Sequence, residues 1–430
     1  MAGYREGPYV EVSVKHESES KLEGHLGLAS GVLLIVTVIL GSGILVLPGF
    51  VFEKIGQDGI YTWFACCLLS APILATMVLL GGAYPSAGGV AHYAKLAFGQ
   101  YLELLVSLLF LGAIMVGLPS ITLAGSVYLQ KLTGPSMDVH LLAALLILLA
   151  GFFALSGGEA LRRGVKLIGS WSVFLLVGAL FALIVLAVRA NGVRFDRPAN
   201  FLSIASQIPV IFFSFTGWEA ASHLAADFRN PKRDFGLAML LAFVLVCGVY
   251  ICSAVLVHVA DIKSNFNAPI FQAAAELAPS APGWLIPLLG ISLIAANLFG
   301  SVVAISRLVL YLSGRRFLPA CLGCLHNGAP RNSVYFVVAS LVLVVACDQI
   351  GWLDIEMMFS LAGMNLLFIY MISALALVRL RRGPVSWLLA TPIVICSVPI
   401  IVGVKSSHPL IASTAILAYV LSRNHRTELT

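Results

Sequence analysis

Long apolar stretches recur along this chain and alternate with short polar connections, and this pattern restricts its fold more than any other feature. A helix needs about 20 residues to cross the hydrocarbon core of a bilayer, which is the scale of these stretches. The 430 residues are 60% hydrophobic and only 11% charged, whereas soluble domains carry roughly 25% charged residues. A fold in water could not bury so much apolar surface, so lipid must surround most of the chain. A soluble protein is therefore excluded.

The stretches predict an all-α integral membrane protein with twelve transmembrane helices. The expected spans are 27–51, 60–82, 101–129, 139–156, 166–188, 204–226, 235–260, 284–312, 333–347, 355–378, 386–403 and 407–422. Residues 1–26 are polar and carry five glutamates, so we expect a disordered cytoplasmic tail there. Residues 423–430 form a second, short tail. No cleaved signal peptide is expected before the first span.

The distribution of basic residues predicts the orientation of these spans. With the N-terminus inside, most of the 26 lysines and arginines fall on cytoplasmic segments, as the positive-inside rule requires. We expect a multi-pass protein of the cell (inner or plasma) membrane with both termini in the cytoplasm, and the net charge of +6 then reflects topology rather than nucleic-acid binding. Glu103 lies near a span end and is expected to meet water. Four tryptophans near span ends are expected at the headgroups: Trp63, Trp284, Trp352 and Trp387.

The cysteines and the known catalytic motifs indicate neither a cofactor nor an enzyme. Cys321 and Cys324 form a single CxxC with His326 nearby, but a zinc site normally has a second ligand pair at regular spacing. No metal and no cofactor are expected. The chain contains no HExxH, GxSxG or Walker lysine motif, so membrane-embedded hydrolysis is not favoured.

Two of the expected spans are interrupted by residues that weaken a helix. In span 1 the stretch Gly41-Ser42-Gly43-Ile44 is followed by Pro48, and in span 6 Ser214-Phe215-Thr216-Gly217-Trp218-Glu219 divides the apolar run. These spans are the first members of two successive five-span sets. Interruptions at corresponding positions of two halves are typical of a binding site near the bilayer midplane.

The interruptions expose peptide groups that a zwitterion can satisfy. An unpaired backbone N–H or C=O costs several kcal/mol in hydrocarbon. A substrate carboxylate suits the N–H groups at the start of a half-helix, and an ammonium suits free carbonyls. The alternative is that Gly41 and Gly43 only permit close helix packing.

Glu219 is the clearest ionisable residue within a span, and such residues are functional candidates by default. Desolvation disfavours its charged form, which suits a residue that binds and releases a proton. His223 and Asp227 follow on the same helical face, so a proton path towards the cytoplasm is one interpretation. In the alternative interpretation, His223 and Asp227 simply meet water, and Glu219 is a buried hydrogen-bond partner that stabilises the interrupted segment.

Four motifs in order resemble the amino acid–polyamine–organocation (APC) superfamily of transporters over roughly residues 25–422. They are Gly41-Ser42-Gly43 with Pro48, Phe215-Thr216-Gly217-Trp218-Glu219, Asn230-Pro231-Lys232-Arg233 and the inner loop Tyr84-Pro85-Ser86-Ala87-Gly88-Gly89. For that loop we expect a re-entrant or tight turn up to His92. Within the superfamily, the stretches 84–92 and 219–235 resemble bacterial exporters of L-methionine and branched-chain amino acids.

The resemblance implies a LeuT-like five-plus-five inverted repeat with broken helices 1 and 6 and alternating access. Repeat one would cover about 27–188 and repeat two about 204–378, with two further helices in 386–422. Ser42 and Gly43 would hold the substrate carboxylate, and the carbonyls of Ile39, Phe213 and Thr216 its amine, with the Phe213 ring as a lid. Glu219, with His223, would couple transport to protons. The full set of expected substrate-binding residues is Ile39, Gly41, Ser42, Gly43, Ile44, Phe213, Phe215, Thr216, Gly217 and Trp218.

The chain departs from the family in the lack of a lysine or arginine at the centre of a span, so only Lys166 is a candidate substitute for a sodium ion. Met115, Asn297 and Ser301 are pocket candidates from span position alone. We expect proton-coupled export of hydrophobic L-amino acids (methionine, leucine, isoleucine, valine) by a monomer or homodimer in membrane lipid. The alternatives are an importer or exchanger of the same family and a non-transporting amino acid sensor.

Overall fold

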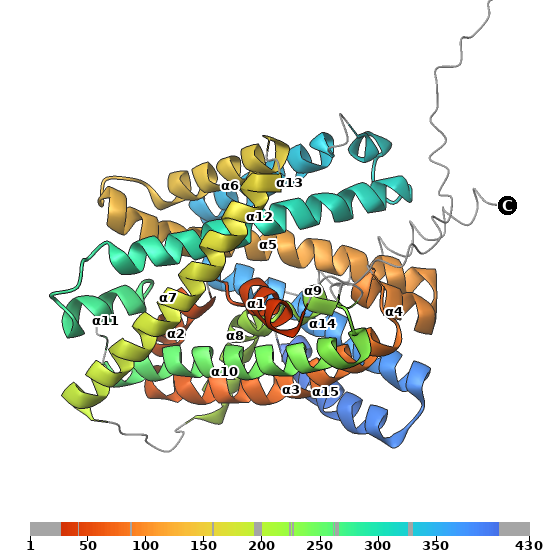
Figure 1. Cartoon of the computed structure of the whole chain (residues 1–430), viewed down its shortest axis with the longest axis horizontal. Coiled ribbons are helices and arrows are strands. Elements are labelled where there is room, and N and C mark those ends of the chain that lie inside the picture. Colours follow the sequence, from red (N-terminus) through yellow and green to blue (C-terminus); the bar gives the residue numbers. More distant parts are fainter. Residues whose placement is uncertain are drawn as a thin grey trace, which may run out of the picture.

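The computed structural model of the chain describes residues 27–41, 43–86, 88–156, 159–192, 200–222, 225, 228–260, 262, 266–325 and 330–403, and every element in these ranges is a helix (Figure 1). The longer helices are α3 (Gly59–Ala83), α5 (Gln100–Thr133), α6 (Val139–Ser156), α7 (Glu159–Asn191), α10 (Gly236–Val259), α12 (Leu285–Gly314), α13 (Arg331–Gln349), α14 (Ile355–Arg381) and α15 (Pro384–Gly403). The shorter ones are α1 (Leu28–Ile39), α2 (Gly43–Ile55), α4 (Gly89–Phe98), α8 (Phe201–Phe212), α9 (Trp218–Ser222) and α11 (Pro269–Leu277). Three 3₁₀ turns and one π turn complete them: η1 (Gly56–Asp58), η2 (Phe213–Phe215), η5 (Ala320–Gly323) and η4 (Pro231–Phe235).

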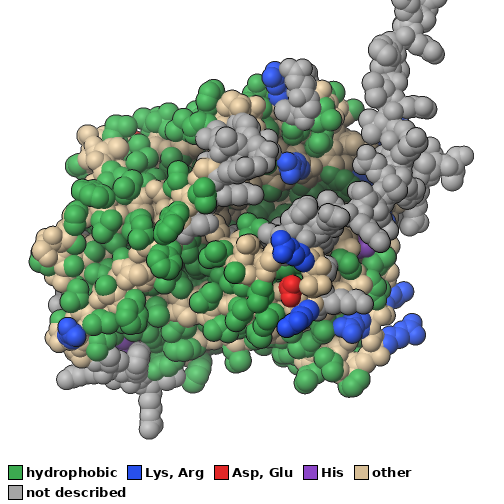
Figure 2. Space-filling model, in the orientation of Figure 1, with side chains coloured by type: hydrophobic (Ala, Val, Ile, Leu, Met, Phe, Trp, Pro, Cys, Tyr) green, Lys and Arg blue, Asp and Glu red, His purple; other side chains and the backbone are tan. Residues whose placement is uncertain are grey.

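The described helices are suited to a bilayer. Nine helical stretches among them are long and apolar enough to cross a membrane, and α1 and α15 contain shorter apolar segments. Large hydrophobic side chains lie outward, such as Phe174 at 70% exposure and Leu202 at 82%. Figure 2 shows a face dominated by hydrophobic side chains, with most of its lysines and arginines towards one end. The expected span 407–422 lies outside the described residues.

The helices enclose a centre in which the short elements lie. α14 packs against α5 and α8, α12 packs against α5 and α7, and α10 packs against α1 and α3. In Figure 1, α7 crosses obliquely over α12 and α10, and α1 lies near the middle of the view. The interrupted segments α1–α2 and α8–η2–α9 are thus surrounded by longer helices. These longer helices are continuous and hold the interrupted segments in position.

Two predictions about residues near span ends are wrong. Trp63 is 1% exposed, and its ring packs against Phe215 and Tyr250 rather than at a headgroup. The second correction concerns Glu103.

The turn expected in the loop that begins at Tyr84 is present, because the Gly89 N–H donates to the Ser86 carbonyl at 3.1 Å. The loop does not reach His92, since α4 already starts at Gly89.

Glu103 is buried and does not simply meet water. Its carboxylate lies 3.1 Å from the Lys95 ammonium, accepts a hydrogen bond from the Tyr311 hydroxyl at 3.0 Å and lies 3.6 Å from the Arg315 guanidinium. A buried charge needs such partners, and these tie α4 to the ends of α5 and α12. Burial, together with the nearby Lys95, also lowers the pKa of His92 on α4 below its ordinary value, so this histidine is neutral at neutral pH.

Gly363 provides a test of the packing between α14 and α8. A Cβ atom at this position would overlap the carbonyl oxygen of Pro209 and lie 3.5 Å from the Phe213 amide nitrogen. We expect Gly363→Ala to lower the free energy of unfolding by about 1–3 kcal/mol, because backbone atoms cannot yield as a flexible side chain can. Thermal unfolding of the purified protein in detergent measures the effect.

Gly248→Ala on α10 is the matched control, because a Cβ there meets nothing within 4 Å. Equal melting temperatures for the two variants would contradict the close approach of α14 to α8.

Candidate functional site

The first interruption separates α1 from α2. α1 ends at Ile39, Leu40 has an extended backbone, and helix resumes at Gly43, while Ser42 lies outside the described residues. Pro48 adds a second irregularity inside α2 because it has no N–H to donate to the carbonyl four residues earlier. That carbonyl belongs to Ile44, and the Ser253 hydroxyl of α10 donates to it at 2.9 Å. A neighbouring helix thus satisfies the group that proline leaves unpaired.

The second interruption lies between α8 and α9. The chain tightens into the 3₁₀ turn η2, Thr216 is extended, and Gly217 has φ +109°, a conformation that favours glycine. The Thr216 amide and hydroxyl both donate to the Phe213 carbonyl, at 3.2 and 2.6 Å. These bonds occupy the acceptor sites of Phe213, one of the three carbonyls expected to bind a substrate amine.

The two interruptions lie next to each other, and Tyr250 of α10 joins them. Its buried hydroxyl lies 3.2 Å from the Ile39 carbonyl oxygen and 2.8 Å from that of Ser214. A hydroxyl has only one proton to donate, so two carbonyls from two helices share a single donor. The Tyr250 ring packs against Trp63 and Phe215, with centroids 5.4 and 5.0 Å away, which fixes the hydroxyl in place.

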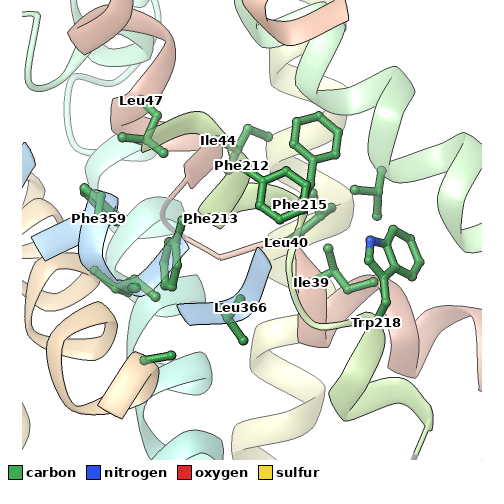
Figure 3. Close-up of a cluster of buried hydrophobic side chains, with 14 of the residues drawn as sticks. Ile39, Leu40, Ile44, Leu47, Phe212, Phe213, Phe215, Trp218, Phe359 and Leu366 are labelled. Carbon is green, nitrogen blue, oxygen red and sulfur yellow. The ribbon is translucent and has the colours of Figure 1, made fainter. Parts of the chain in front are cut away.

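Apolar side chains surround the interruptions (Figure 3). The Phe213 ring lies 5.4 Å from the Phe359 ring of α14. A Cβ at Gly117 of α5 would come within 2.7 Å of the Phe213 ring, so the ring fits between α5 and α14 only because Gly117 has no side chain. On the other side, Trp218 is fully buried and packs against Phe243.

Glu219 lies at the start of α9, directly after the interruption. Its side chain turns back, and both carboxylate oxygens accept from the Gly217 N–H, at 3.1 and 3.0 Å. The Tyr370 hydroxyl of α14 donates to the same carboxylate. Glu219 is buried with these two donors, which compensate for its removal from water. These donors stabilise the ionised form of Glu219. If Tyr370 moved away, the carboxylate would lose a donor and would bind a proton more readily.

The structure brings most of the predicted site residues together. Ile39, Gly41, Gly43 and Ile44 lie at the first interruption and Phe213, Phe215, Thr216, Gly217 and Trp218 at the second. The side chain of Asn297 comes within 3.8 Å of a Cβ position on Gly41, whereas Met115 and Ser301 are half-buried on α5 and α12. Ser42, His223, Asp227 and the Lys166 side chain lie outside what the structure describes.

Tyr250, Tyr370 and Ser253 are the polar residues of this centre that sequence analysis missed. Each is a single hydroxyl in a long apolar helix, and its partner is 36 to 211 residues away in the chain. The signal available in the sequence is that a tyrosine inside a span normally needs a hydrogen-bond partner. It does not identify which partner.

The chain matches the amino acid permease family model over residues 26–422. It is 28% identical to the L-methionine/branched-chain amino acid exporter YjeH of Escherichia coli, over 91% of this chain and 95% of that protein. It is 27% identical to the uncharacterized amino acid permease YecA of Bacillus subtilis, over 86% of this chain and 88% of that protein. The methylthioribose transporter of Bacillus subtilis is 22% identical over 88% of this chain and 86% of its own length.

Replacing Tyr250 by phenylalanine tests the connection between the two interruptions. Tyr250→Phe keeps the ring but leaves the Ile39 and Ser214 carbonyls without their donor. We expect the free energy of unfolding to fall by about 1–3 kcal/mol, the usual cost of an unsatisfied buried group. Denaturant or thermal unfolding in detergent measures it.

Tyr335→Phe, at an exposed position on α13, should leave stability unchanged. If Tyr250→Phe were as stable as this control, the hydroxyl would not hold the two segments together.

Proposed function

The chain belongs to the amino acid permease family, and from this premise we propose that it is a proton-coupled transporter that exports hydrophobic L-amino acids. Members of the family are transporters, so the protein is a multi-pass amino acid transporter and not an enzyme. The observation that carries the finer proposal is the adjacency of the two interrupted helices, with a buried carboxylate beside them.

The two interruptions support binding of a zwitterion. α2 begins at Gly43, where the first N–H groups of a helix lack acceptors and carry a partial positive charge. The substrate carboxylate would bind there, at Ser42 and Gly43. The carbonyl end of α1 at Ile39 has the opposite polarity and would face the ammonium together with Thr216. Because Phe213 already accepts two hydrogen bonds, its carbonyl would have to exchange one of them for the substrate.

The apolar surroundings support a hydrophobic side chain on the substrate. Phe213, Phe359 and Leu366 flank the interruptions (Figure 3), and Glu219, the acidic group beside them, already has donors on both oxygens. A cationic side chain would find no free counter-ion among these residues. The name of the E. coli relative, a methionine and branched-chain exporter, agrees with this choice.

Glu219 and Tyr370 support proton coupling. The carboxylate belongs to α9 and its hydroxyl donor to α14, so a movement between these helices would change how well the charged form is stabilised. A proton would bind when the Tyr370 contact opens and leave when it forms. His223 would continue the path towards the cytoplasm.

The same premise supports a topology of twelve spans in a five-plus-five inverted repeat, with repeat one at about 27–188 and repeat two at about 204–378. Both termini would lie in the cytoplasm of a cell-membrane protein. In this arrangement α1–α2 and α8–η2–α9 would be the broken first helices of the two repeats, and the others would be continuous.

Purified full-length protein in proteoliposomes tests the proposed function. We expect counterflow of radiolabelled L-leucine and L-methionine, competition by the other branched-chain amino acids, and net flux driven by a pH gradient. Amino acid flux opposite to the flow of protons identifies an exporter-type antiporter. Amino acid flux in the same direction as the protons identifies an importer. Absence of flux with retained binding would contradict transport and select the sensor alternative.

Glu219→Gln tests the proton coupling. Glutamine is always neutral and keeps an oxygen that can accept the Gly217 N–H. We expect pH-gradient-driven flux to fall by about tenfold or more, the scale on which a positioned proton-transfer group acts, while counterflow at equal pH continues.

Glu356→Gln is the control, because this carboxylate pairs with Lys54 at the partly exposed end of α2. The coupling role of Glu219 fails if both variants respond to the pH gradient as the wild type does.

A further inference from the structure

Ser214 carries a buried hydroxyl with no hydrogen-bond partner among the described residues. It lies in η2, and the side chain is 4% exposed. Its backbone carbonyl is held by Tyr250, but its Oγ atom is not held by anything described. Buried hydroxyls are nearly always paired, because leaving one unpaired is costly. An unpaired hydroxyl that also faces the start of a half-helix at the candidate site is placed to donate to a ligand bound there.

The Ser214 hydroxyl points at the beginning of α2. A Cβ atom on Gly43 would overlap Ser214 Oγ and lie 2.8 Å from Ser214 Cβ. Gly43 is the first residue of this 13-residue helix, so the hydroxyl lies against N–H groups that have no acceptor within the helix. Two kinds of donor, a side-chain O–H and backbone N–H groups, meet at one point from two different helices.

We propose that the Ser214 hydroxyl is a binding group for the substrate carboxylate and donates to it together with the N–H groups at the start of α2. This inference rests on the proposed binding of an amino acid and adds a residue of the second interruption to that site. A carboxylate accepts several hydrogen bonds through two oxygens, which matches donors that arrive from two sides. The bound carboxylate would connect α2 to η2.

The close contact between Gly43 and Ser214 has a consequence for this role. The hydroxyl is shut off from solvent where it lies, so α2 and η2 must separate for a carboxylate to enter. Glycine at position 43 permits the approach, because any larger residue would displace Ser214. The substrate carboxylate then takes the place of the direct contact between the two segments.

Binding measurements on the purified full-length chain test the inference. L-leucine and L-leucinamide share a side chain and an amine, but only L-leucine has a carboxylate. The affinity of each is measured by its competition with radiolabelled L-leucine. We expect Ser214→Ala to weaken L-leucine binding by about tenfold or more, as expected for a lost hydrogen bond to a charged group. The affinity for L-leucinamide should stay within about twofold of the wild type.

Stability separates this role from a structural one. Ser214→Ala removes an unpaired hydroxyl, so its melting temperature should equal or exceed that of the wild type. Ser306→Ala is the matched control, since this buried hydroxyl donates to Val302 within its own helix, and its ratio of leucine to leucinamide affinity should not change.

The inference is overturned if Ser214→Ala weakens both ligands equally or leaves both affinities unchanged. Because binding rather than flux is measured, a wild-type protein that binds L-leucine but does not transport it would contradict only the transport proposal. A wild-type protein that neither binds nor transports L-leucine or L-methionine would contradict both proposals.

Discussion

The centre of this protein depends on how peptide groups are satisfied where a helix is interrupted in an apolar environment. A regular helix pairs its own N–H and C=O groups, and an interruption removes that pairing at a cost of several kcal/mol per group. Here the missing partners come from intact neighbours. Ser253 donates to the carbonyl that faces Pro48, and Tyr250 donates to carbonyls from both interruptions. The long helix α10 thus stabilises two segments that could not be stable alone.

The incomplete part of this pairing is the basis of the proposed substrate site. Tyr250 has one proton for two carbonyls, the start of α2 has N–H groups without helical acceptors, and Ser214 has no described partner. The proposed zwitterionic substrate carries both a donor and an acceptor end and would complement these groups, which hydrocarbon chains of lipid cannot do. The apolar rings around them add contact area without adding charge.

Several features were correctly predicted because they depend on local sequence. The lengths of the apolar stretches place most helices to within a few residues, as for α6 at Val139–Ser156. The glycines mark where helix resumes, because α2 begins at Gly43 and α9 begins directly after Gly217. Trp63 and Glu103 were wrongly placed because position along a span does not reveal neighbours. Trp63 faces Phe215 and Tyr250 of other helices, and Glu103 meets Lys95, Tyr311 and Arg315.

The sequence by itself determined the solvent, the helical class and the family, because apolar length, backbone pairing and short motifs are local properties. It also located the interruptions at Gly43 and Gly217. Only the tertiary structure decided that Gly43 lies against Ser214 and Gly217 against Ile39, that Tyr250 donates to carbonyls of both interruptions, and that Tyr370 donates to Glu219. Each of these contacts joins residues 36 to 211 positions apart. No local pattern specifies such pairs, since they follow from which helix faces meet when the whole bundle packs.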